Sequence, residues 1–93
     1  MPGMQVYAVL HLSNPTAVED ALRSHFLNDH RPLGNNEWLV ASRAVTSKEI
    51  SDALGISDGR NGYGIVIAMN GYWGWATNDI WEWIAAKKAE PNG

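Results

Sequence analysis

The sequence gathers its tryptophans in one short stretch. Four of the five lie between positions 73 and 83, at Trp73, Trp75, Trp81 and Trp83. On a strand, Trp73 and Trp75 would point to the same side, because alternate residues share a face. Large aromatic side chains dominate the energetics of cores and interfaces, and exposed ones stack on planar ligands. Three interpretations follow: packing of the last helix, burial in a homodimer interface, or a stacking platform built from Trp73 and Trp75.

The histidines form no recognisable metal or catalytic motif. His25 and His30 are five residues apart, so they do not share a helical face. No zinc-binding spacing with an adjacent acid is present, so we expect neither a metal ion nor another cofactor. His11 falls at the end of the first predicted strand and is the one candidate catalytic residue. Paired carboxylates and a nucleophile elbow are also missing, which favours a non-catalytic protein.

A glycine-rich stretch at residues 55–64 has the composition of a phosphate-binding loop. Such a loop runs from a strand into a helix, so that backbone N–H groups converge on the phosphate. This stretch is predicted to run from a helix to a strand. We therefore expect a surface connection rather than a nucleotide site.

Composition limits the classes of protein that the chain can belong to. Its 93 residues suit a single domain, 1–93, with little apolar surface to spare. There are no cysteines, which excludes a disulfide framework and a thiolate metal site. No apolar run approaches the length of a membrane span, and no signal segment is evident, so we expect a cytoplasmic protein. The net charge of -3 argues against tight, non-specific binding of nucleic acid.

Apolar patterns and capping signals predict the elements. Residues 6–12 read as a strand with two faces: the one with Val6 and Ala8 is wholly apolar and should lie under helices, whereas the one with Tyr7 and Val9 is mixed and should be open or meet a partner. A helix should start at Asn14 and Pro15. Residues 31–34 form an ambiguous edge strand leading through a turn to a clear strand at 38–41.

The second half of the chain has sharper signals. Thr46 and Glu49 form a capping box, Val45 and Ile50 a hydrophobic staple, and Gly55 a helix stop. Residues 65–69 are apolar on both faces, which predicts a central strand, and residues 71–75 look like its continuation. A last helix should open at residues 78–80 and end near 87–88. The order β-α-β-β-α-β predicts a ferredoxin-like α+β sandwich with an added C-terminal helix.

Three stretches resemble a known family: residues 9–15 (VLHLSNP), 37–40 (EWLV) and 46–54 (TSKEISDAL). On these, the chain resembles the small ferredoxin-like proteins of the CRISPR-adaptation nuclease group, especially their SinR-like relatives. The resemblance implies a homodimer formed through the sheets. In some members it also implies metal-dependent cleavage of nucleic acid by an Asp at the end of the first strand. His11 occupies that corner here, and a neutral imidazole is a poor ligand for magnesium.

The preferred interpretation is therefore a non-catalytic, homodimeric regulatory or interaction module on a ferredoxin-like scaffold. One alternative is a metal-dependent ribonuclease or deoxyribonuclease of the resembled family, acting through His11. Another is a small-ligand or nucleic-acid binder that uses Trp73 and Trp75. The candidate interface is the mixed strand face with the surplus aromatic residues: Tyr7, Val9, His11, Trp38, Trp73 and Trp75.

Overall fold

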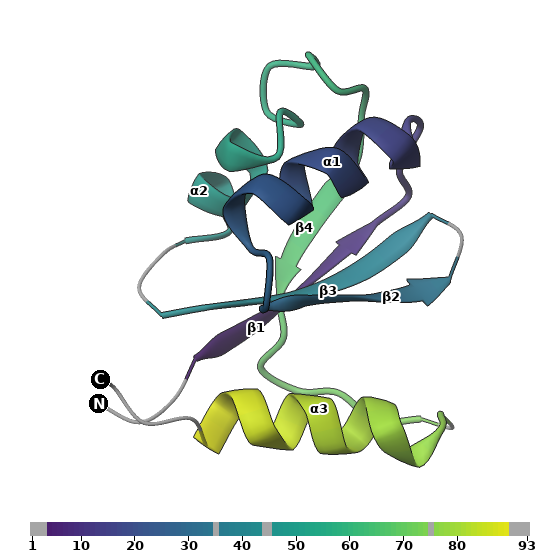
Figure 1. The fold of residues 1–93 in the computed structure, drawn as a ribbon, viewed down its shortest axis with the longest axis vertical. Helices are drawn as coiled ribbons and strands as arrows, with labels where there is room; N and C mark the ends of the chain where they lie inside the picture. The colour runs from purple at the N-terminus through teal and green to yellow at the C-terminus, as the bar shows by residue number, and fades with distance from the viewer. Residues whose placement is uncertain (1–3, 35, 44–45, 75, 90–93) are drawn as a thin grey trace.

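One antiparallel sheet lies between helices in the computed structural model, which describes residues 4–34, 36–43, 46–74 and 76–89 (Figure 1). The strands form a single four-stranded sheet in the order β2-β3-β1-β4, and each neighbouring pair is antiparallel. The predicted α+β class is confirmed. The elements are, in chain order, β1 (Gln5–Leu10), α1 (Pro15–His25), β2 (His30–Gly34), β3 (Glu37–Ser42), α2 (Ser47–Ala53), β4 (Ile65–Ala68) and α3 (Asn78–Ala89).

Local capping signals explain where the first two helices begin and end. The Asn14 side chain accepts a hydrogen bond from the Ala17 N–H at the start of α1. The capping box of Thr46 and Glu49 is present at the start of α2, and Gly55 follows this helix with a φ of 75°. Each device satisfies backbone groups that a helix end leaves without a partner. Val45, the other half of the predicted staple, lies outside the described residues.

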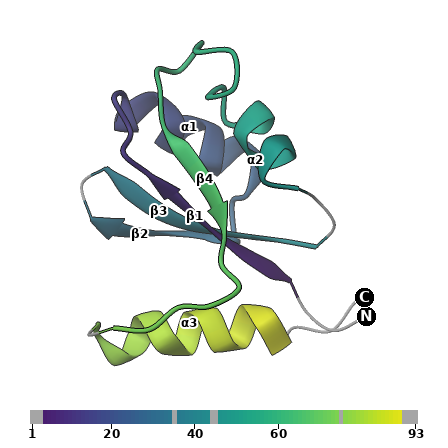
Figure 2. The same ribbon diagram turned by 180° about the vertical axis from the view of Figure 1, so that it is seen from behind.

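The helices α1 and α2 cover one face of the sheet (Figures 1 and 2). Their contribution to the main core comes from Val18 and Leu22 on α1 and Ile50 on α2. The sheet contributes alternate residues of its two central strands, which meet across the sheet as register partners. Those residues are Tyr7, Val9, Trp38 and Val40.

The helix α3 lies on the opposite face of the sheet (Figure 2). A second, smaller core forms there, in which Ile84 of α3 is buried with Val6, Leu39 and Ala41. The expected assignment of the faces of β1 is therefore wrong: the mixed face with Tyr7 lies under two helices, and the apolar face with Val6 lies under one. Both faces are apolar enough to be buried, so their composition alone could not rank them.

The last strand differs from its predicted position. β4 pairs only with β1, so it is an edge strand rather than a central one. Two of its side chains, Ile65 and Ile67, are 51% and 46% exposed. The described residues 71–74 are also not a strand but an irregular connection to α3. Among the described residues, no helix combines the length and the apolar character that crossing a membrane requires.

Candidate functional site

A cavity opens where α3 meets the sheet, on the face away from α1 and α2. Its volume is about 240 Å³, and its wall combines the sheet, the connection after β4 and the inner side of α3. None of its described lining residues carries a charge. They are Ala8, Leu33, Leu39, Met69, Tyr72, Trp73, Ala76, Ile80, Trp81 and Ile84.

Three aromatic rings form a stack at the rim of this cavity. The ring centroid of Trp81 lies 5.9 Å from that of Trp73 and 6.4 Å from that of Tyr72, with both pairs stacked. The Lys88 ammonium lies 5.6 Å from the Tyr72 ring centroid. Trp73 is nevertheless 93% exposed. Trp75, the expected second half of the platform, lies outside the described residues.

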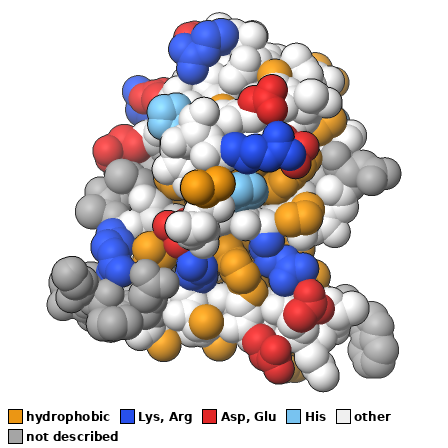
Figure 3. All heavy atoms as spheres, viewed as in Figure 1, with side chains coloured by type: hydrophobic (Ala, Val, Ile, Leu, Met, Phe, Trp, Pro, Cys, Tyr) orange, Lys and Arg blue, Asp and Glu red, His pale blue; other side chains and the backbone are white. Residues whose placement is uncertain are grey.

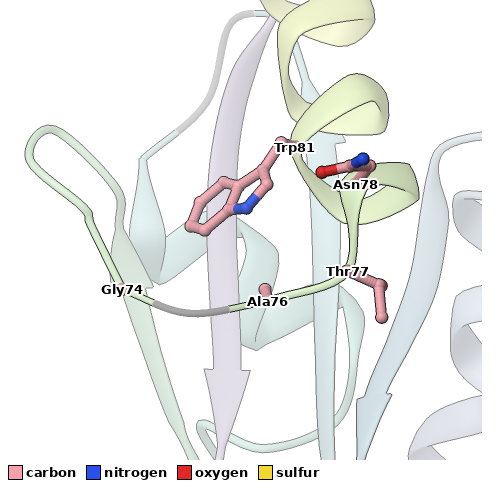
Figure 4. Close-up of a pocket in the computed structure, with 5 residues that line it drawn as sticks. All are labelled: Gly74, Ala76, Thr77, Asn78 and Trp81. Carbon is pink, nitrogen blue, oxygen red and sulfur yellow. The ribbon is translucent and has the colours of Figure 1, made fainter.

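Trp81 also borders a larger and more open hollow, of about 580 Å³, at the start of α3. Figure 4 shows its indole extending from the helix beside Gly74 and Ala76, with Thr77 and Asn78 at the helix entry. The polar groups around this hollow belong to the first turn of the helix. The hollow therefore adds an open, mixed rim to the apolar cavity rather than a separate enclosed site.

The apolar surface continues from the cavity onto the edge of the sheet. Ala8 lines the cavity and is the register partner of Ile67 on β4. Leu10, the next residue on that face of β1, is the partner of Ile65. Register partners share a face of the sheet, so both isoleucines lie on the α3 side. We call Ile65, Ile67, Leu33, Tyr72 and Trp73 the apolar surface; all five are exposed.

Two ion pairs fasten α3 beside this surface. Arg31 of β2 lies 2.9 Å from the Asp79 carboxylate at the start of the helix, and Lys87 near its end lies 2.8 Å from Asp29. A hydrogen bond from Thr77, followed by one from Arg31, holds the pKa of Asp79 below its ordinary value. Figure 3 shows Lys and Arg side chains between the sheet and α3. Opposite charges are therefore paired between α3 and its neighbouring segments, next to a cavity whose described lining residues are all uncharged.

Several residues expected at an interface are instead part of the core. Tyr7, Val9 and Trp38 are buried beneath α1 and α2, within a single chain. Burial, and to a smaller extent the negative charge of Glu49, raises the pKa of the Tyr7 phenol. These three side chains are not on a surface that a partner could contact. Of the residues expected at the interface, Trp73 lines the cavity, whereas His11 lies at the end of β1 against Tyr63.

His11 ends β1 in an unusual backbone conformation. Its φ of 58° lies in the left-handed region, where histidine is among the more tolerated residues. Its exposed ring lies against that of Tyr63, with centroids 5.3 Å apart. Within the part of the chain that the structure describes, no three His, Asp or Glu side chains come together to hold a metal ion. The contact that the structure shows for the His11 ring is this tilted one with Tyr63.

Sequence reasoning missed most of the apolar surface. The sequence pattern predicts a central strand for Ile65 and Ile67 and gives no reason to single out Tyr72 or Leu33. A signal was available for the isoleucines: β4 is short, and glycine-rich segments flank it on both sides. Very short strands are typical of sheet edges.

Comparisons of the chain with family models, with curated proteins and with solved structures found no match.

Proposed function

We propose that this chain is a non-catalytic interaction module on a ferredoxin-like scaffold, and that it pairs with a second copy through the apolar surface. The observation that carries the proposal is Trp73, whose indole is 93% exposed beside an uncharged cavity. Ile65 and Ile67 extend the same surface along the edge of the sheet. Contiguous exposed apolar surface of this kind marks interaction sites.

The energetic argument starts from the size of the chain. A domain of this length buries a modest share of its surface, so additional burial matters to it. A tryptophan hides about 200 Å² when buried, which corresponds to about 5 kcal/mol of transfer free energy. Leaving that surface in water therefore favours a partner that covers it.

The identity of the partner follows from charge and geometry. The net charge of -3 and the uncharged cavity disfavour a polyanion such as nucleic acid. A second copy presents a surface of the same apolar character, so two copies can cover each other around a two-fold axis. The exposed isoleucines also lie on an edge strand, which natural proteins commonly shield.

The ferredoxin-like scaffold is part of the same proposal. Its support is the order β1-α1-β2-β3-α2-β4 together with the antiparallel strand order β2-β3-β1-β4. Both connecting helices lie on one face of the sheet (Figure 1). In this description α3 is an addition that occupies part of the other face, which leaves the apolar surface beside it for the partner.

Light scattering on the purified chain tests this proposal. At micromolar concentration we expect a particle of twice the chain mass of 10.2 kDa. Ile67→Lys should yield the single-chain mass, because a buried, unpaired ammonium at the interface is strongly unfavourable. The control is Leu27→Lys: Leu27 is 66% exposed but belongs neither to the cavity nor to the apolar surface.

The control variant should keep the dimer mass. A wild-type chain that remains a monomer throughout the micromolar range contradicts the proposal. So does an Ile67→Lys variant that is folded and still dimeric.

A further inference from the structure

We infer that Trp73 of each copy inserts into the cavity of the other copy, so that the site is completed only by the second chain. This inference rests on the proposed pairing and names the residue and the cavity that make it specific. It assigns a role to the most exposed large hydrophobic side chain among the described residues.

The size of the cavity selects the kind of occupant. The enclosed apolar part, about 240 Å³, lies below the range of about 300–1,000 Å³ that is usual for sites that hold a whole small molecule, whereas the hollow of about 580 Å³ that shares Ala76 and Trp81 with it is open and has a mixed lining. A single aromatic side chain is the better match in volume. The wall is apolar and aromatic, so an inserted indole would lie in the apolar surroundings that such a side chain favours.

The position of Trp73 makes the insertion reciprocal between the two copies. Its indole both forms part of the cavity wall and projects from the rim. In a two-fold pair, a contact of residue i with residue j is repeated with the roles of the copies reversed. Mutual insertion therefore places the two Trp73 rings close together, near the two-fold axis.

The area that this contact buries is consistent with a stable pair. Each inserted indole hides about 200 Å², which is about a quarter of the ~800 Å² that each partner contributes to a standard interface. Leu33, which also lines the cavity, and Ile65 and Ile67 on the edge strand β4 are exposed on the same face of the sheet and can add to this area. A tryptophan in a partner's pocket, surrounded by weaker apolar contacts, is the usual arrangement of an energetic hot spot.

The polar groups nearby do not oppose this arrangement. Arg31 and Asp79 beside the cavity neutralise each other at 2.9 Å, so the approach of an identical surface brings no net like charge to the centre. Lys88 lies over Tyr72 at the rim, where its ammonium can stay in water.

The dimer dissociation constant of Trp73→Ala, measured by sedimentation equilibrium, tests the inference. We expect it to rise at least about 30-fold, the factor that corresponds to the loss of one hot-spot contact. Leu27→Ala is the matched control and should leave the constant unchanged. Because Trp73 is almost fully exposed in the single chain, its truncation should leave the chain folded, which circular dichroism checks.

Free indole is a second probe, since it matches the inserted side chain. Added in excess to the wild-type chain, it should occupy the cavity and shift the equilibrium toward the monomer. The inference is overturned if Trp73→Ala dimerises as tightly as Leu27→Ala, or if indole binds without changing the oligomeric state. In both cases the pairing would rest on Ile65 and Ile67 without Trp73, whereas a monomeric wild type removes the pairing and the insertion together.

Discussion

Single carboxylates and hydroxyls near the start of α3 decide how firmly the helix is held. Asp79 accepts a hydrogen bond from the Arg31 guanidinium, and hydrogen bonds from Thr77 and Arg31 lower the pKa of its carboxyl. The same negative charge lies in the first turn of the helix, where it also interacts favourably with the helix dipole. Three favourable interactions of one exposed residue thus depend on its being ionised.

We predict that this contribution depends on pH. Because the pKa of Asp79 is lower in the folded chain than in the unfolded one, the ionised group stabilises the fold at pH values above about 4 and loses this effect as the pH falls through the folded value. Urea unfolding of the wild type and of Asp79→Asn should therefore differ at pH 7 and converge in acid. The pKa of Asp52 is also lowered, but this residue is present in both the wild type and the variant, so its contribution cancels when their stabilities are compared. A difference that is constant from neutral pH into acid contradicts the prediction.

At the scale of elements, the end of α2 shows how a local signal determines a boundary. Gly55 and Gly59 both have a φ of 75°, a conformation that side chains with a Cβ rarely adopt. They differ in their surroundings. A Cβ on Gly55 would lie 2.5 Å from Asn61 Nδ2, whereas one on Gly59 would have no atom within 4 Å. That Asn61 nitrogen donates a hydrogen bond to the Leu54 carbonyl at 2.8 Å, which closes the connection back onto the helix.

We predict that the two alanine variants separate strain from crowding. Gly59→Ala should lower the free energy of unfolding by about 1 kcal/mol, from backbone strain alone. Gly55→Ala should cost about 1 kcal/mol more, because it also displaces Asn61 and its hydrogen bond to a backbone carbonyl. Chemical denaturation of both variants measures the difference. Equal losses would mean that the Asn61 contact contributes nothing to stability.

The elements that sequence reasoning identified correctly are those with local signals. Asn14 and the pair Thr46 and Glu49 act within one helical turn, so they can be recognised without the rest of the fold. The faces of β1 and the edge position of β4 depend instead on which distant segment packs against them. The backbone of His11 added to the difficulty: its positive φ interrupts the alternation after Leu10, and Leu12 joins the same core as Tyr7. The cavity could not be foreseen, since segments far apart in the sequence form its wall.

At the scale of the whole molecule, the sheet separates two cores of unequal size. The larger lies under α1 and α2, and the smaller is built around Val6, Leu39 and Ile84 under α3. Apart from Ile84, the α3 residues of the smaller core are only partly buried. Local stability follows such differences in burial, so α3 is expected to open more readily than the central strands. The proposed partner would then cover the part of the structure that is held least firmly.

We predict that Ile84→Ala loosens α3 selectively. Truncation of a buried isoleucine costs about 2–5 kcal/mol, and this side chain packs on one face of the sheet only. Hydrogen exchange should therefore accelerate more in residues 80–89 than in β1 and β3, and the emission of Trp81 and Trp83 should shift to the red. Ile50→Ala, which removes the same side chain from the larger core, is the matched control. It should accelerate exchange in the central strands as well, because those strands share that core with α2. If the two variants gave the same exchange pattern, the two cores would unfold as one cooperative unit, and α3 would be as firmly held as the sheet beneath it.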